Sequence, residues 1–181
     1  STVATVTEIY DYLRVLFARI GTPHCPQCGR EVHAQSAQVI VEKIAALPEG
    51  TRFQVLSPLA RNRKGTFQDT LAKARADGFT RVRIDGELHN LDEKISLEKQ
   101  KKHDIELVVD RLEIPGPSSF DRSEFITRLT DSVETALKKS EGQINIDIAN
   151  DQTWILSDRN ACPNCGISFP ELNPAMFSFN S

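Results

Sequence analysis

Apolar residues recur at helical spacing in four stretches of the chain, and in the stretches between them apolar and polar residues alternate. The helical spacing predicts helices at residues 1–21, 36–47, 66–77 and 121–140. The first begins with a capping-box pattern, Thr5 and Glu8, and Gly21 stands where helices commonly end. The last is the longest and carries its apolar residues on one face, as expected of a helix that covers a core.

The alternating stretches predict β-strands at residues 52–59, 79–87, 103–112, 143–149 and 153–157. In the second of these, Val82 and Ile84 share one face, and Arg81 and Arg83 share the other. We therefore expect a strand that buries its apolar side and presents a charged stripe on rigid backbone.

Three details follow from the strand pattern. Pro58 is expected to end the first strand or to place it at an edge, because proline donates no hydrogen bond to a ladder. In the third strand, simple alternation places Asp110 on the same face as Glu106. The pair Asp85-Gly86 signals a hairpin or a bulge.

Residues 61–65, between the first strand and the helix that follows it, form a short basic stretch with Arg61, Arg63 and Lys64. We expect a loop here, because Gly65 follows the cations directly. Such a loop can contact phosphate or an acidic partner, and it can equally be an ordinary solvated surface.

The order of these elements predicts an α+β fold, with a mostly antiparallel sheet of four to five strands and helices packed largely on one face. No apolar run approaches about 18 residues, so we expect no membrane span. Lysine and arginine number 22 against 25 aspartates and glutamates, which gives a formal net charge of −3. This balance argues against a stand-alone nucleic-acid binder and confines any basic surface to a local patch.

The four cysteines lie in two copies of one pattern, Cys25-Pro26-Gln27-Cys28-Gly29 and Cys162-Pro163-Asn164-Cys165-Gly166. Each C-x-x-C turn brings two thiolates to one metal ion, and two such turns complete a four-thiolate zinc site. Such a site has no open position, so its zinc is structural. The turns are 133 residues apart, whereas a compact zinc ribbon has about 15 to 20. We therefore expect a whole domain inserted into a zinc module.

Other chemistry is open to these cysteines. The pairs could form disulfides, although the chain begins with a polar stretch rather than a secretory signal, and its cysteine use fits a reducing cytoplasm. They could be two unrelated thiol pairs, or a flanking histidine, His24 or His33, could replace one ligand. The duplicated pattern favours zinc held by Cys25, Cys28, Cys162 and Cys165.

The sequence carries no recognisable motif for catalysis. It lacks the phosphate-binding loop, the dinucleotide-binding glycine pattern, the nucleophile elbow of hydrolases and the zinc-protease motif. Its histidines are scattered, and its acidic residues follow exposed patterns that single out no acid–base pair. The residues alone therefore predict a binding or interaction domain built on a zinc clamp rather than an enzyme.

Several stretches closely resemble bacterial UvrA, the damage-sensing ATPase subunit of the nucleotide excision repair excinuclease. The most specific is the opening run Ser1–Arg14. The others are Leu16–Arg19, Arg63–Gly65, Arg83–Glu87, Leu97–His103 and Phe177–Asn180. The similarity extends over essentially the whole chain. It implies a fragment that carries the UvrB-interaction domain and its flanking first zinc module, from a cytoplasmic protein of the SOS response.

The resemblance also implies how the chain is divided. Residues 1–24 would be a helix of the ATPase core, residues 169–181 would return to that core, and residues 25–30 with 160–168 would form the zinc module. Residues 31–159 would be the inserted UvrB-binding domain. The phosphate-binding loop and the ABC signature would lie outside these residues, so the fragment would not be an enzyme. The parent would be a homodimeric, DNA-dependent ABC-type ATPase, and only the parent would bind ATP.

For contact with UvrB, the resemblance favours cations on the charged strand faces, because the family interface is polar. The candidates, in order, are Arg81, Arg111, Arg83, Lys64 and Arg63. Arginine suits bidentate pairing with the carboxylates of a partner. The alternatives are an ordinary solvated surface, or direct contact between the insertion and DNA through Arg61, Arg63, Lys64 and the run Lys99–Lys102.

Overall fold

The computed structural model describes residues 9, 12, 13, 16, 23–117, 119–149, 152–162, 164, 165 and 167. The chain divides into two compact units, one formed by Gln35–Arg159 and the other by Ser1–Ala34 with Asn160–Ser181. The helix predicted at residues 1–21 lies mostly outside the described residues, although the four described positions there are helical. The return segment predicted at residues 169–181 lies wholly outside them.

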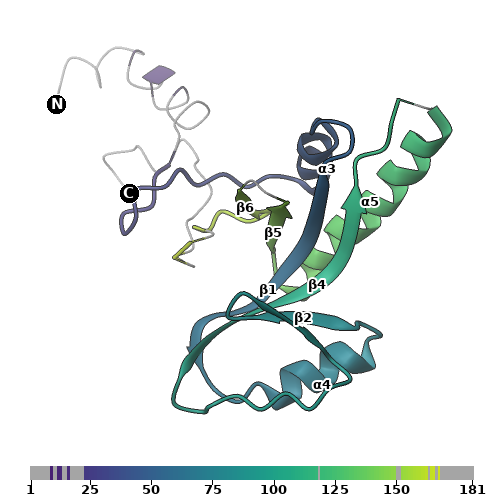
Figure 1. Ribbon diagram of the computed structural model, residues 1–181. Helices are drawn as coiled ribbons and strands as arrows, with labels where there is room; N and C mark the ends of the chain where they lie inside the picture. Colours follow the sequence, from purple (N-terminus) through teal and green to yellow (C-terminus); the bar gives the residue numbers. More distant parts are fainter. Residues whose placement is uncertain are drawn as a thin grey trace. The chain divides into compact units, whose positions relative to one another are not determined.

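The unit Gln35–Arg159 is an α+β fold, as predicted (Figure 1). Its six-stranded sheet has the order β3-β2-β4-β1-β5-β6, and every neighbouring pair is antiparallel. The described elements of this unit are α3 (Ala37–Ala45), β1 (Arg52–Lys64), α4 (Gln68–Ala76), β2 (Arg81–Ile84), β3 (Glu87–Asn90), β4 (Lys102–Glu113), α5 (Ser119–Lys139), β5 (Gln143–Ile148) and β6 (Thr153–Ser157).

Local signals explain where α3 and α5 begin and end. The Ser36 hydroxyl accepts a hydrogen bond from the Val39 N–H at 3.3 Å and caps the start of α3. After α5, Gly142 has φ +110° and donates its N–H to the Leu137 carbonyl at 2.7 Å. This left-handed position after the last turn is one that glycine adopts without strain.

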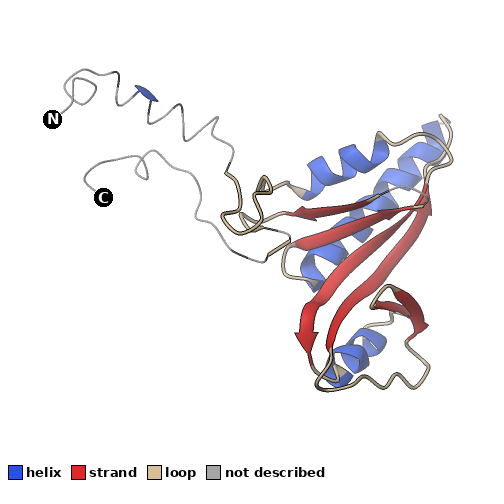
Figure 2. Ribbon diagram, turned by 60° about the vertical axis from the view of Figure 1, so that its left-hand side comes forward, coloured by secondary structure: helices blue, strands red, loops and turns tan. Residues whose placement is uncertain are grey.

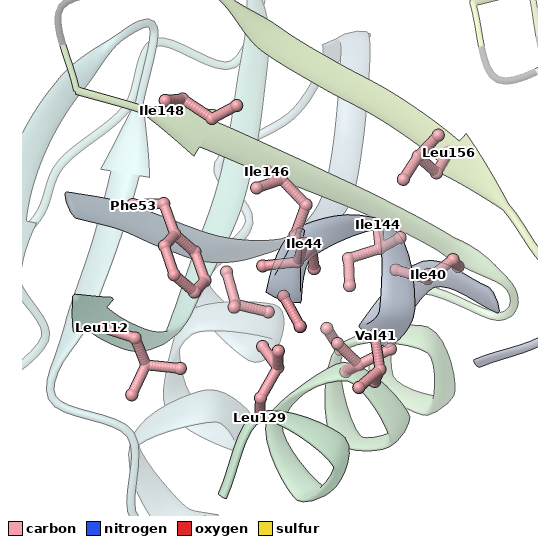
Figure 3. Close-up of a cluster of buried hydrophobic side chains, with 14 of the residues drawn as sticks. Ile40, Val41, Ile44, Phe53, Leu112, Leu129, Ile144, Ile146, Ile148 and Leu156 are labelled. Atoms are coloured by element: carbon pink, nitrogen blue, oxygen red, sulfur yellow. The ribbon is translucent and has the colours of Figure 1, made fainter. Parts of the chain in front are cut away.

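The larger core cluster lies between α3, α5 and the part of the sheet formed by β1, β5, β6 and the end of β4. The rings of Phe53 in β1 and Phe125 in α5 meet edge to face, with centroids 6.4 Å apart. Figure 3 shows side chains from the helices and the strands meeting in this layer; those labelled are Ile40, Val41, Ile44, Phe53, Leu112, Leu129, Ile144, Ile146, Ile148 and Leu156.

All three described helices of this unit lie on the same face of the sheet. The Ser57 hydroxyl of β1 donates to the Ala136 carbonyl of α5 at 2.7 Å, so Ser57 faces α5. Leu107 of β4 is directly opposite Ser57 and shares a buried cluster with Leu71 of α4. Directly opposite residues share a face, so α4 covers the same face as α5, at the other end of the long strands β1 and β4 (Figure 2).

Two expectations about β1 need correction. Residues 61–65 are not a loop up to Gly65, because β1 continues to Lys64, where it still pairs with β4. Pro58 does not end the strand, since its pairing with β4 continues after a register shift between Pro58 and Ala60. The described pairing of β1 with β5 stops at Leu56, so Pro58 lies where β1 pairs with β4 alone, as the edge alternative requires.

Two further expectations about the sheet need correction. The predicted four to five strands become six, because Glu87–Asn90 returns along β2 as the separate strand β3 after the Asp85-Gly86 turn. Asp110 does not share the face of Glu106. An extra residue in β4 opposite the Val55–Leu56 step turns Asp110 towards α5, where its carboxylate meets Arg128 and Ser132.

Among the described residues, no helix combines the length and the apolar character needed to cross a membrane.

Candidate metal centre and interaction surface

The four cysteines lie together although the two pairs are far apart in the sequence. Their Sγ atoms all lie within 4.8 Å of one another, and those of Cys28 and Cys162 are 3.6 Å apart. Cys25 and Cys162 are buried, Cys165 is half-buried and Cys28 is exposed. Tetrahedral zinc with bonds of about 2.3 Å separates its sulfur ligands by about 3.8 Å, so the cluster is close to the geometry that zinc requires.

Hydrogen bonds shape each cysteine turn. In the first turn, the Cys25 N–H donates to the Arg30 carbonyl at 2.8 Å, and Gly29 takes the left-handed conformation with φ +70°. In the second turn, the Cys165 N–H donates to Cys162 Sγ at 3.4 Å. An amide that donates to sulfur favours the thiolate, which is the form that binds metal.

The thiols of Cys28 and Cys165 differ in how readily they ionise. A hydrogen bond from the Arg30 backbone, helped by the other three thiols, lowers the pKa of Cys28 to about 6. Burial, together with the neighbouring thiols, raises the pKa of Cys165 to about 12. The lowered pKa of Cys28 favours its thiolate near neutral pH, whereas a metal ion that binds Cys165 must displace its proton.

The alternatives to a four-thiolate site fit the geometry less well. All four thiols are free, and the 3.6 Å between Cys28 and Cys162 exceeds the roughly 2.05 Å of a disulfide bond. Both flanking histidines approach Glu31: His33 Nε2 lies 3.1 Å and His24 Nε2 lies 3.9 Å from its carboxylate. Among the described residues, the potential metal ligands that cluster are the four cysteines.

The face of the sheet opposite the helices, called here the open face, carries three of the predicted arginines. Val82 and Ile84 are buried on the helix side of β2, so Arg81 and Arg83 lie on the open face. In β4, Arg111 is directly opposite Gln54, which lies between Phe53 and Val55, two residues of the helix-side core. Arg111 is therefore on the open face as well.

Arg83 is held in a network of side chains from three strands. Its Nε atom lies 2.7 Å from Glu106 Oε2, and its Nη1 atom lies 2.9 Å from Asp147 Oδ2. The Asn145 side chain donates to the other oxygen of Glu106 at 2.7 Å. Burial alone would lower the pKa of Arg83, but the two carboxylates outweigh it and raise the pKa. The guanidinium of Arg83 is therefore occupied by ion pairs within the sheet.

Arg81 and Arg111 are exposed. Among the ion pairs that the structure describes in residues 23–117 and 119–149, none includes either of them. Arg111 lines a hollow of about 470 Å³ at one end of the open face, together with Arg52, Gln54, Glu113 and Asp147. Leu88, directly opposite Arg83 on β3, is also exposed there. The open face therefore combines two exposed arginines that are in none of the described ion pairs with an exposed apolar side chain.

The remaining predicted contact residues, Arg63 and Lys64, lie elsewhere. They end β1 beside the first residues of β4, whereas Arg111 stands near the end of β4. Lys102 and Arg111 are nine positions apart along β4, which is about 30 Å of strand at 3.4 Å per residue. The five predicted cations thus form two separate groups.

The sequence pattern does not predict the network around Arg83. Alternation places Glu106 and Asp147 on the outer side of their strands, but the strand order that brings them to Arg83 is not visible in any one segment. Charged residues of opposite sign on the outer faces of separate strands were the available signal.

The geometry can be compared with known proteins. Residues 35–150 match the family model of the UvrA interaction domain. UvrABC system protein A of Clostridium acetobutylicum is 50% identical over 182 residues, which cover the whole of this chain and 19% of that protein. The proteins of the same name from Bacillus subtilis and Streptomyces coelicolor are 48% and 50% identical, again over the whole of this chain and 18% of each relative.

The chain thus spans about a fifth of the length of the curated relatives it matches. The family match covers the helices α3, α4 and α5 and the strands β1 to β5, and two of these strands, β2 and β4, carry the arginines of the open face. The resemblance seen in the sequence is confirmed: the chain belongs to the UvrA family and carries the UvrA interaction domain at residues 35–150.

Proposed function

We propose that residues 31–159 form a protein-interaction domain that docks UvrB, and that Arg81 and Arg111 on the open face make the leading contacts. The observation that carries the proposal is the contrast between the arginines of this face. Arg83 forms ion pairs with Glu106 and Asp147, whereas Arg81 and Arg111 are exposed and in no described ion pair.

Rigid strands suit this role better than a flexible loop. Arg81 and Arg111 project from β-strands whose positions are set by the ladder and by the core beneath, so docking orders little backbone. Each guanidinium can bind a partner carboxylate with two parallel hydrogen bonds. Leu88 adds an apolar contact beside them. The surface therefore fits a partner with acidic groups around a small apolar patch.

We also propose that the four cysteines hold a structural zinc ion. The described cluster offers four sulfur atoms at nearly the required spacing, and no fifth position for a substrate is needed in such a site. The ion would fix the two cysteine turns of the unit Ser1–Ala34 with Asn160–Ser181 to each other. These turns would form the halves of the zinc module at residues 25–30 and 160–168.

For the longer protein, the proposal follows the family. It would be a cytoplasmic, homodimeric ABC-type ATPase that acts on damaged DNA in nucleotide excision repair, with ATP bound outside the 181 residues of this chain. Residues 1–24 and 169–181 would belong to its ATPase core. The names of the relatives, UvrABC system protein A, support this assignment.

Calorimetric titration of the 181-residue chain with purified UvrB tests the docking proposal. Replacing Arg81 and Arg111 together by alanine should weaken binding by about 2 kcal/mol or more, because two charged pairs at the interface are lost. The far-UV circular dichroism should not change. A matched control, Lys73→Ala with Arg75→Ala, removes two exposed cations from α4 and should bind like the original chain. Equal affinity of all three proteins would refute the assignment.

A further inference from the structure

Six cations lie together where the last residues of β1 pair with the first residues of β4, in a chain whose net charge is −3. Three come from the end of β1, two from the turn that leads into β4, and one, Lys102, is the first residue of β4. All six are exposed. We call this group the basic tip: Arg61, Arg63, Lys64, Lys99, Lys101 and Lys102.

The strand register places like charges against each other in the basic tip. Lys64 is directly opposite Lys102, and Arg63 is directly opposite His103. Like charges in directly opposite positions destabilise an antiparallel pair. Among the ion pairs described in residues 23–117, none includes Arg63, Lys64 or Lys102. The stability of the sheet therefore does not explain this arrangement, and a bound anion would relieve it.

Hydrogen bonds fix the two segments of the tip in place. His103 is buried between two acceptors: its Nδ1 atom lies 2.7 Å from Asp85 Oδ2, and its Nε2 atom lies 3.2 Å from the Glu98 carbonyl. Both ring nitrogens therefore donate, and the imidazolium holds the lysine turn against the hairpin of β2 and β3. The Asn62 N–H donates to Asp104 at 2.6 Å. The cations of the tip are therefore carried by backbone segments that these hydrogen bonds hold together.

Three exposed acidic side chains, Asp85, Asp104 and Glu98, lie beside the tip. Asp85 accepts from His103 and from the Asp104 N–H, and Asp104 accepts from the Asn62 N–H. The His103 imidazolium balances the charge of Asp85, which leaves two carboxylates against the six cations. The tip therefore keeps a net positive charge.

The composition of the tip points to phosphate. Four of its six cations are lysines, which are depleted at protein–protein interfaces, whereas arginine and aromatic residues are enriched there. None of the exposed large hydrophobic residues among the described positions belongs to the tip, so it offers no aromatic platform on which single-stranded bases could stack. We propose that the basic tip binds the phosphate backbone of double-stranded nucleic acid.

This proposal is independent of UvrB docking. The tip lies about 30 Å along β4 from Arg111, at 3.4 Å per residue, so one set of substitutions can disable each surface. Lys64→Ala with Lys102→Ala tests the tip. Arg81→Ala with Arg111→Ala, which removes the same number of charges from the open face, is the matched control.

The experiment measures fluorescence anisotropy of a labelled mixed-sequence DNA duplex titrated with the 181-residue chain between about 50 and 200 mM NaCl. The tip variant should bind the duplex about tenfold more weakly at low salt. The slope of log affinity against log salt should fall by about 2, because each lost phosphate contact removes about one unit. The open-face variant should bind the duplex like the original chain.

Other outcomes would overturn the proposal. If both double variants bind the duplex equally well, the tip does not contact it. If the original chain prefers a single strand of the same sequence, the ligand is not a duplex. If the tip variant loses UvrB and keeps DNA, the tip is a protein-binding surface. The thermal midpoint of the tip variant should not fall, because the substitution removes a like-charge pair.

Discussion

Residues of the same type have different tasks in this domain. Arg81 and Arg83 are two positions apart on the same strand and the same face, yet only Arg83 is enclosed by carboxylates. Removing Arg83 would leave Glu106 and Asp147 close together without their cation, and such uncompensated charge costs stability. We therefore expect Arg83 to maintain the open face and Arg81 to contact the partner.

His103 makes the stability of the domain depend on pH. The hydrogen bond to Asp85, the largest cause, raises the pKa of His103, and burial, together with a smaller repulsion from Lys101, opposes the rise only in part. The Asp104 backbone and His103 lower the pKa of Asp85. The pair therefore contributes fully between the ordinary aspartate pKa of about 4 and the ordinary histidine pKa of about 6.5. Its contribution is lost as pH rises through the higher folded pKa of His103, and also as pH falls through the lowered pKa of Asp85.

We predict that the difference in unfolding free energy between the original chain and a His103→Gln variant shrinks from about pH 6 to about pH 9. Glutamine cannot become cationic, so the variant lacks the proton that the original histidine gains on folding. Urea unfolding monitored by circular dichroism at each pH gives the difference. A difference that is constant over this range would mean that His103 acts only by packing.

Cys28 gives a test of the proposed zinc. A Cys28→Ser variant should lose most of its bound metal, because serine removes one of the four thiolates and is a poor zinc ligand at neutral pH. The sheet should stay folded, since its two core clusters contain no residue of the cysteine group. Metal analysis by emission spectroscopy and circular dichroism provide the two readings.

The control for this variant is Gln27→Ser, which changes the same turn without touching a candidate ligand. It should keep its metal. Loss of the sheet signal together with the metal in Cys28→Ser would contradict the idea that residues 31–159 fold independently of the cysteine cluster.

At the scale of elements, the sequence predicts most of the fold because the spacing of its apolar residues matches the period of a helix or of a strand in most segments. Helices α3, α4 and α5 and five of the six described strands fall within a few residues of their expected ranges, apart from the end of β1. The failures lie where the backbone is irregular. Alternation in β4 breaks at an extra residue, and β1 continues past a proline, because strand pairing overrides local preference at both places.

The pairing of β1 with β4 makes a prediction about stability. Lys102→Glu places an acidic side chain directly opposite Lys64. It should raise the free energy of unfolding by roughly 0.5–1 kcal/mol, since a repulsive cross-strand pair becomes attractive. Lys102→Gln, which only removes the repulsion, should fall between the two. Urea denaturation measures the change, and the gain should shrink at high salt. A Lys102→Glu variant less stable than the original chain would contradict the register.

At the scale of the whole molecule, the resemblance supplied what periodicity could not. Spacing alone showed a long insertion between two cysteine turns, and the structure shows the four thiols gathered. Which arginines form ion pairs within the sheet depends on the strand order, which brings β2, β4, β1 and β5 side by side. The sequence therefore offers five candidate cations, and the structure separates them into two groups, of which the one with Arg81, Arg83 and Arg111 lies on the open face.

Site-specific photo-crosslinking tests most directly which face meets UvrB. Leu88 on the open face and Val39 on α3 are almost equally exposed, at 50% and 48%, so a benzophenone side chain at either position is equally accessible. If UvrB docks on the open face, we expect a crosslink to UvrB from position 88 and none from position 39. A crosslink from position 39 alone would place UvrB on the helices and contradict it.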